Sequence, residues 1–201
     1  PAARAALARA RGDAPAPWVA VMESAIALQA GDVLSAREHL ARQAATPAAP
    51  LPVPLMQSDL QLMDGDAPAA VATLRTALQR WPAHPALVAQ LARVQLLSDR
   101  VDEAAATLAP AQGTAHAEIA LVRAELARRQ GDAPGTLGAY TEATQLAPRD
   151  ARGWQGLGSA HTEREDARPA RASLQQALSL SPQIPGAWGE LGTLETFTNQ
   201  F

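Results

Sequence analysis

The sequence predicts an all-α fold, and three observations support this prediction. The chain of 201 residues is rich in alanine, which has the highest intrinsic helix propensity of all residues. Only 3% of its residues are aromatic and a single one is tyrosine, so side chains typical of β-strands are scarce. The tetrapeptide GDAP begins at Gly12, Gly65 and Gly131, and the related GDVL begins at Gly31. The copies at 31, 65 and 131 lie 34 and then 66 residues apart, which is one period and nearly two.

Each of these glycine–aspartate pairs from Gly31 onward stands between two segments of helical character. A glycine that ends a helix adopts the left-handed conformation, and the aspartate after it can accept hydrogen bonds from free N–H groups of the next helix. A proline in that first turn loses no hydrogen bond, because its N–H would have no partner within the helix. The tetrapeptide therefore predicts a tight elbow between two antiparallel helices. Helices are expected before the elbows at 19–30, 55–64 and 117–130, and after them at 34–43, 69–80 and 136–147.

The segment that begins at Ala151 shows the repeated unit most clearly. With Ala151 as position 1, the matched residues are Trp154 at 4, Leu157 at 7, Gly158 at 8, Ala170 at 20, Ala177 at 27 and Pro182 at 32. This pattern resembles the tetratricopeptide repeat, a helix–turn–helix unit of about 34 residues. The segment departs from the family pattern at positions 11 and 24, where His161 replaces tyrosine and Leu174 replaces phenylalanine.

The resemblance covers nearly the whole chain and implies a right-handed superhelical solenoid of antiparallel helix pairs. Five whole repeats are expected, at 17–50, 51–84, 85–116 (two residues short), 117–150 and 151–184. Residues 1–16 are expected to be a helix of a clipped preceding repeat, and 185–201 the first helix of a truncated sixth, so that the parent protein continues. Pro52 and Pro54 predict a short first helix in the second repeat, and Pro110 predicts an early end to the second helix of the third.

The composition argues against several classes of function. There is no cysteine, which excludes disulfides, thiolate metal sites and a cysteine nucleophile, and no two of the four histidines have metal-ligand spacing. We found no catalytic constellation, so we expect a protein that is not an enzyme and has no catalytic residues, metal or cofactor. The net charge of −3 gives no support to nucleic-acid binding. Apolar runs fall far short of the roughly 20 residues of a membrane span.

The resemblance also implies where a partner would bind. In such arrays the first helix of each repeat lines a concave face, and positions 2, 5, 9 and 12 of the repeat face the groove. The predicted partner-binding residues are Val21, Leu28, Leu55, Asp59, Leu62, Arg93, Leu96, Leu121, Glu125, Arg128, Arg129, Arg152 and Gln155. An apolar stripe followed by arginines suits a peptide or amphipathic helix with some acidic character. The alternative is that neighbouring helices fill the apolar stripe.

The resemblance implies a non-catalytic protein–protein interaction scaffold that binds a peptide or helix in this groove. All 17 basic residues are arginine, a composition that favours a bacterial source. Such arrays occur in envelope, exopolysaccharide-export and assembly proteins, so we expect a segment of such a protein in the periplasm, with the cytoplasm as the alternative. A second hypothesis is the substrate-recognition arm of a larger glycosyltransferase, sulfotransferase or hydroxylase. Self-association through exposed repeat edges is also left open.

Overall fold

The computed structural model describes residues 16–44, 46 and 49–198. These residues form eleven α-helices and one 3-10 helix, and no strand occurs among them. The predicted all-α fold class is therefore confirmed for this part of the chain. The helix expected at residues 1–16 lies outside the described residues, apart from Ala16. The chain divides into two compact units, with the boundary between Pro82 and Ala83.

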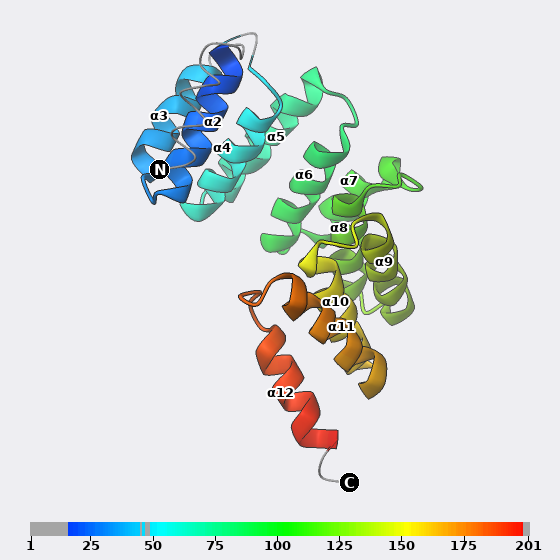
Figure 1. Ribbon diagram of the computed structural model, residues 1–201. Coiled ribbons are helices and arrows are strands. Elements are labelled where there is room, and N and C mark those ends of the chain that lie inside the picture. The colour runs from blue at the N-terminus through cyan, green and yellow to red at the C-terminus, as the bar shows by residue number, and fades with distance from the viewer. Residues whose placement is uncertain (1–15, 45, 47–48, 199–201) are drawn as a thin grey trace. The chain divides into compact units, whose positions relative to one another are not determined.

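The described residues of the first unit form two antiparallel helix pairs (Figure 1). Its helices are α2 (Ala16–Gln29), α3 (Val33–Ala44), α4 (Pro52–Met63) and α5 (Ala67–Arg80). Helix α2 packs against α3, α4 packs against α5, and α3 also contacts α4. A core cluster forms where α2, α3 and α4 meet, and it contains the buried side chains of Val21, Leu40, Val53 and Leu60.

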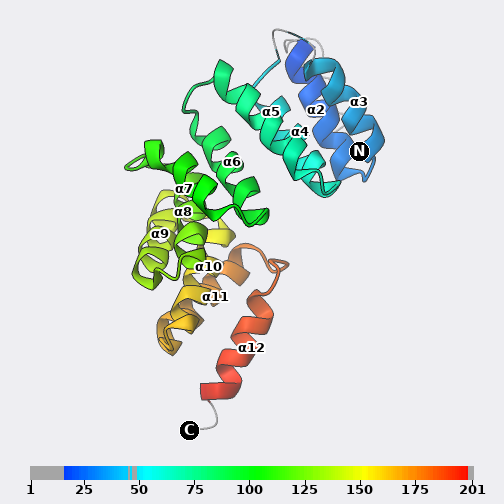
Figure 2. The same ribbon diagram turned by 180° about the vertical axis from the view of Figure 1, so that it is seen from behind.

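The second unit continues the same pairing over seven α-helices. They are α6 (Pro85–Leu97), α7 (Val101–Leu108), α8 (Ala117–Arg129), α9 (Ala133–Leu146), α10 (Ala151–Glu163), α11 (Ala167–Leu180) and α12 (Ala187–Thr198). Each of α8, α10 and α12 also contacts the second helix of the preceding pair (Figures 1 and 2). Contacts of α6 with α8 and of α10 with α12 bring first helices side by side. The first helices thus form one layer of this unit.

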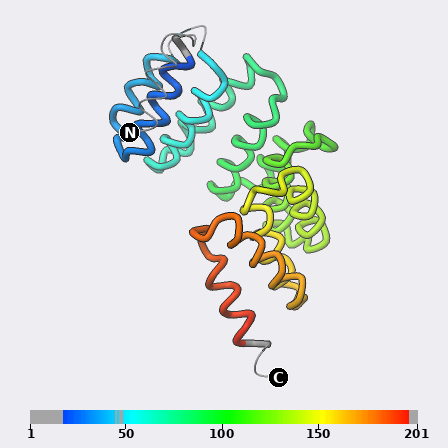
Figure 3. Tube along the Cα trace, in the orientation of Figure 1, coloured from blue at the N-terminus to red at the C-terminus, as the bar shows by residue number. Residues whose placement is uncertain are grey.

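The glycine of the repeated tetrapeptide closes a helix in the left-handed conformation, as predicted. Gly31, Gly65 and Gly131 have φ angles of 77°, 77° and 73°. Each lies in the short turn between the two helices of a pair, where the chain reverses direction (Figure 3). The copy at Gly12 lies outside the described residues.

The aspartate after each of these glycines caps the next helix, which was also predicted. The Oδ1 atoms of Asp32, Asp66 and Asp132 accept hydrogen bonds of 3.1, 3.0 and 2.9 Å from the backbone N–H three residues later. Asp166 stands at the same position of its elbow but makes no such bond. Its carboxylate instead accepts a hydrogen bond from Arg164 and lies 3.5 Å from Nδ1 of His161.

The three prolines predicted to disturb helices have different effects. Pro52 and Pro54 do not shorten α4, which has 12 residues and begins at Pro52, so that prediction is wrong. The reason is that both prolines lie in the first turn, where the missing N–H groups have no intrahelical partner. Pro110 does end its helix early: α7 has only 8 residues, and the 3-10 helix Ala109–Ala111 follows it.

Small residues recur where helices of a pair cross. Ala36, Ala70, Ala104 and Ala170 are fully buried, and they stand at position 20 of their repeats. Gly158 has the same role on α10, because a Cβ atom there would lie 2.7 Å from Cγ of the buried Leu174. The burial of these residues fits the 34-residue spacing, whereas the limits of the individual repeats stay a prediction.

Candidate functional site

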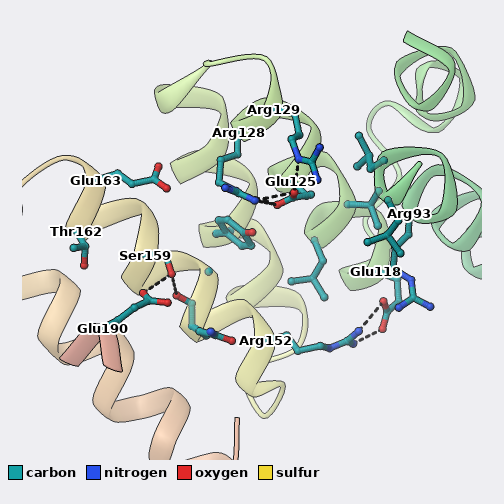
Figure 4. Close-up of a pocket in the computed structure, with 17 residues that line it drawn as sticks. Arg93, Glu118, Glu125, Arg128, Arg129, Arg152, Ser159, Thr162, Glu163 and Glu190 are labelled. Carbon is teal, nitrogen blue, oxygen red and sulfur yellow. Dashed lines mark hydrogen bonds and ion pairs between the residues drawn. The ribbon is translucent and has the colours of Figure 1, made fainter. Parts of the chain in front are cut away.

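A groove of about 760 Å³ lies in the second unit, with 17 residues in its wall (Figure 4). Helices α6, α8 and α10 supply most of the wall, while α9 and α12 contribute Tyr140 and Glu190. Leu96, Leu97, Leu121 and Val122 form the apolar part of the wall, and all four belong to α6 and α8. These two helices also supply charged side chains, whereas α10 supplies charged, amide and hydroxyl side chains.

The helical periodicity explains why α8 presents several side chains to the groove. Glu118, Leu121, Glu125 and Arg128 follow one another at intervals of three or four residues, which places them on one stripe of the helix. The same stripe on α10 consists of Arg152, Gln155, Ser159 and Thr162. Both sets occupy positions 2, 5, 9 and 12 of their repeats, and all eight side chains line the groove.

Eight of the thirteen residues predicted from the sequence come together in this one groove. They are Arg93, Leu96, Leu121, Glu125, Arg128, Arg129, Arg152 and Gln155. The resemblance therefore predicted the position of these side chains along the second unit. That they contact a partner stays a prediction.

The other five predicted residues belong to the first unit and lie in different surroundings. Val21 is only 8% exposed and belongs to the core cluster between α2, α3 and α4, against which Leu28 packs as well. The alternative left open by the sequence, that neighbouring helices fill the apolar stripe, describes these two residues. On α4, Leu55 and Leu62 are half-buried and Asp59 is exposed.

Glu125 holds two of the groove arginines on the surface of α8. Arg128 donates to it through Nε at 3.0 Å and through Nη2 at 2.8 Å, and Arg129 donates through Nε at 3.1 Å. Arg129 also reaches Asp99, at 3.4 Å from its Nη1. The hydrogen bonds to Glu125 raise the pKa of Arg128 above its usual value.

Arg152 lies between two carboxylates from different repeats. It donates to Asp150 through Nε at 3.1 Å and through Nη2 at 2.6 Å, and it also contacts Glu118, which stands 34 residues earlier. Bonds to Asp150 and Glu118 raise the pKa of Arg152, and the bond from Arg152 lowers the pKa of Asp150. This network connects α8 with α10 along the groove wall (Figure 4).

These ion pairs remove the basis for one expectation about the partner. The sequence suggested an acidic partner because several arginines follow the apolar stripe. In the structure Arg128, Arg129 and Arg152 already contact carboxylates of the same chain. An acidic group would therefore have to compete with Glu125 or Glu118 for each of them.

Tyr140 of α9 forms part of the groove wall because α10 carries a glycine opposite it. A Cβ atom on Gly156 would lie 2.1 Å from Cε1 of the ring, so only glycine allows the ring to pack this closely. Burial raises the pKa of Tyr140, and the nearby carboxylates of Glu125, Glu163 and Glu190 add to the shift. Arg128 acts in the opposite direction. The phenol therefore stays neutral beyond its ordinary range.

Sequence reasoning missed several residues of the groove, among them Leu97, Tyr140, Glu163 and Glu190. Tyr140 stands at position 24, which the resemblance assigns to packing within the helix pair. A glycine inside a helix at Gly156 is the signal that could have indicated an approaching ring. Glu190 stands at position 6 of its repeat and Glu163 at position 13, and neither belongs to the predicted stripe.

Two further properties hold for the described residues. None of their helices combines the length and apolarity needed to cross a membrane. No group of three or more histidine, aspartate or glutamate side chains among them is arranged to hold a metal ion.

Comparison with known proteins agrees with the helix-pair architecture. A model of the family described as tetratricopeptide repeat matches residues 61–126. A search among curated proteins gave no match.

Three solved structures illustrate the fold. A chain of the APC/C hetero-tetramer Cut9-Hcn1 is similar with a TM-score of 0.80 at 14% identity, covering 90% of this chain and 37% of that one. A thermophilic tetratricopeptide repeat protein of Thermus thermophilus has a TM-score of 0.59 at 25% identity, and the match covers 72% of this chain and 81% of that one. The PilF protein of Pseudomonas aeruginosa has a TM-score of 0.65 at 20% identity, and the match covers 73% of this chain and 68% of that one. This chain thus spans little more than a third of the first of these.

Paired antiparallel helices with left-handed elbows, buried small residues and a groove along the first helices define a helical-repeat protein. The family match over residues 61–126 and the similar structures support the tetratricopeptide repeat as the repeating unit. The fold of this family generally mediates protein–protein interaction.

Proposed function

We propose that this chain is a non-catalytic scaffold whose groove in the second unit binds a peptide or helix of a partner protein. The single observation that carries the proposal is the groove itself. Its volume of about 760 Å³ falls in the range of roughly 300–1,000 Å³ that is usual for ligand sites. Its wall combines leucines with charged side chains, which is the composition of a surface that takes an amphipathic segment.

The apolar side of the groove supplies the main contact area in this proposal. Leu97 is 64% exposed, although leucine is normally buried, and it lines the groove together with Leu96 and Leu121. Covering such side chains removes apolar surface from water, which stabilises a complex by about 25 cal/mol per Å². The polar side would fix the position of the bound segment.

The test selects peptides from a random phage-displayed library on the immobilised protein and measures their affinity by fluorescence anisotropy. Replacing Leu97→Ala together with Leu121→Ala should weaken binding at least about tenfold, since each loses apolar contact area. The matched control, Leu34→Ala with Met63→Ala, changes two exposed apolar residues of the first unit and should leave affinity unchanged. Equal binding by both variants would place the peptide site outside the groove.

We further propose that this protein acts in a bacterial envelope, as part of an export or assembly complex. The lysine-free composition and the similarity to bacterial repeat proteins support a bacterial source. An antibody against this chain would check the location in fractionated source cells. Signal in the periplasmic fraction is the expected result, and signal confined to the cytoplasmic fraction would contradict it.

A further inference from the structure

The charges that line the groove are not balanced along its length. Four arginines and four glutamates face it, but two further carboxylates, Asp99 and Asp150, contact the arginines from outside the wall. Three arginines, Arg128, Arg129 and Arg152, thus share four carboxylates. The positive charge of these three arginines is already neutralised by carboxylates of the chain itself.

Two glutamates of the wall form no ion pair with any described arginine, although Glu163 adds, after Glu125, to the raised pKa of Arg128. Glu163 makes no hydrogen bond or ion pair with any residue that the structure describes, and it extends from α10 toward the middle of the groove (Figure 4). Glu190 of α12 accepts a hydrogen bond of 2.6 Å from the hydroxyl of Ser159, which carries no charge. The wall at α10 and α12 therefore carries two carboxylates that no ion pair among the described residues neutralises.

Tyr140 adds a second feature that suits a cation at this end. Its ring packs on Gly156 and forms part of the wall together with Glu163 and Glu190. The face of an aromatic ring attracts a lysine or arginine head group placed over it. Burial is the main cause of the raised pKa of Tyr140, and the charges of Glu125, Glu163 and Glu190 add to it.

We infer that the segment bound in this groove carries a lysine or arginine, whose cation lies at Glu163 and Glu190 beside Tyr140. Apolar side chains of the same segment contact Leu97 and Leu121. This inference deepens the proposed function and rests on it. The occupant is a basic amphipathic peptide segment of a partner protein, and charge complementarity at one end of an apolar groove is the argument for it.

An acidic segment fits the same groove less well. Each new ion pair with Arg128 or Arg152 would displace a bond that Glu125 or Asp150 already makes, so one pair is gained and another is lost. The same segment would also bring its charge toward Glu163, where like charges repel. A basic group gains its ion pairs without displacing any arginine.

The experiment uses peptides selected from the random phage library and compares their composition with that of the unselected library. Selected sequences should be enriched in lysine or arginine beside apolar residues. Replacing Glu163→Gln with Glu190→Gln should weaken them by about five- to tenfold and flatten the dependence of affinity on salt. The control, Glu38→Gln with Glu165→Gln, removes the same charge from exposed positions outside the groove and should change affinity less than about twofold.

The outcomes separate this inference from the function on which it rests. One outcome overturns the inference but supports the peptide-binding groove. In that outcome the selected peptides lose affinity for the Leu97→Ala and Leu121→Ala variant, but they are not enriched in basic residues or bind the Glu163→Gln and Glu190→Gln variant equally well. Peptides that ignore the leucine variants, or a selection that yields none, count against both. Melting temperatures of the glutamine variants close to that of the parent chain show that a loss of affinity does not reflect unfolding.

Discussion

The same repeat positions have different surroundings in the two units. At position 5, Val21 of the first unit is buried in a core cluster, whereas Leu121 of the second unit is half-buried in the groove wall. At position 12, Leu28 packs against that core, whereas Arg128 is exposed and bound to Glu125. The position in a repeat therefore fixes which side of the helix a residue occupies, but not whether a neighbour covers it.

Position 24 differs less between the units. Tyr140 at this position of α9 lies in the groove wall, but the other residues at position 24 are buried leucines, Leu40 and Leu74 in the first unit and Leu108 and Leu174 in the second. These residues lie inside a helix pair, so the partner helix that covers them comes from the same repeat. Contacts within a pair are set by the repeat itself, whereas the surroundings of positions 5 and 12 depend on what lies beyond the pair.

The largest effect is expected where the two units agree. Leu40→Ala and Leu174→Ala should each lower the free energy of unfolding by about 2–5 kcal/mol, because both side chains are at most 1% exposed and leave a cavity. Urea denaturation followed by circular dichroism measures the change. A loss below about 1 kcal/mol at either site would mean that position 24 is not the shared core of both units.

A smaller effect should separate the units at position 5. Val21→Ala removes buried methyl groups and should cost about 1–2 kcal/mol of stability. Leu121→Ala should cost less in the same denaturation experiment, because its side chain is half-buried, but should weaken peptides selected on the protein. If Leu121→Ala destabilises as much as Val21→Ala and leaves peptide affinity unchanged, position 5 is a core position in both units.

The contrast also explains how far the sequence could predict the site. Pairing, elbows and caps depend on residues close together in sequence, so Gly65, Asp66 and Pro110 predicted them correctly. Charge at the groove depends on which arginine meets which carboxylate, as when Arg152 reaches Glu118 from 34 residues away. The sequence shows the number of arginines along a helix stripe but not the carboxylates that pair with them. We expected an acidic segment because these ion pairs within the chain could not be predicted.

The elbows offer a third comparison. Both described elbows of the first unit, and the elbow at Gly131 in the second, have glycine in the left-handed position, whereas Asp99 and Glu165 occupy it in two other elbows of the second unit with φ angles of 59° and 63°. A residue with a Cβ atom is strained there by about 1 kcal/mol. Glu165→Gly should therefore raise stability by about 0.5–1 kcal/mol, and Gly65→Glu should lower it by a similar amount. Thermal denaturation would contradict this strain if both changes had the same sign.

The smallest effect concerns the electrostatics of the groove alone, because Tyr140 is the single tyrosine of the chain and reports on the second unit. Its pKa is raised above 10.0 by burial and by nearby carboxylates, so phenolate absorbance should appear only at higher pH in the folded protein. The folded state holds the phenol proton more tightly than the unfolded chain does. The protonated phenol therefore contributes fully to the free energy of unfolding below about pH 10, and this contribution is lost as the pH rises through the folded pKa.

Two variants should move that titration in opposite directions. Glu163→Gln removes a carboxylate and should lower the pKa of Tyr140, whereas Arg128→Gln removes the opposing cation and should raise it further. A bound lysine peptide should act like the first variant, since it brings a positive charge to the same end of the groove. Spectrophotometric titration measures the pKa of Tyr140 in both variants and in the peptide complex. If this pKa is the same in all three, the ring is remote from the charges on which the basic-segment inference depends.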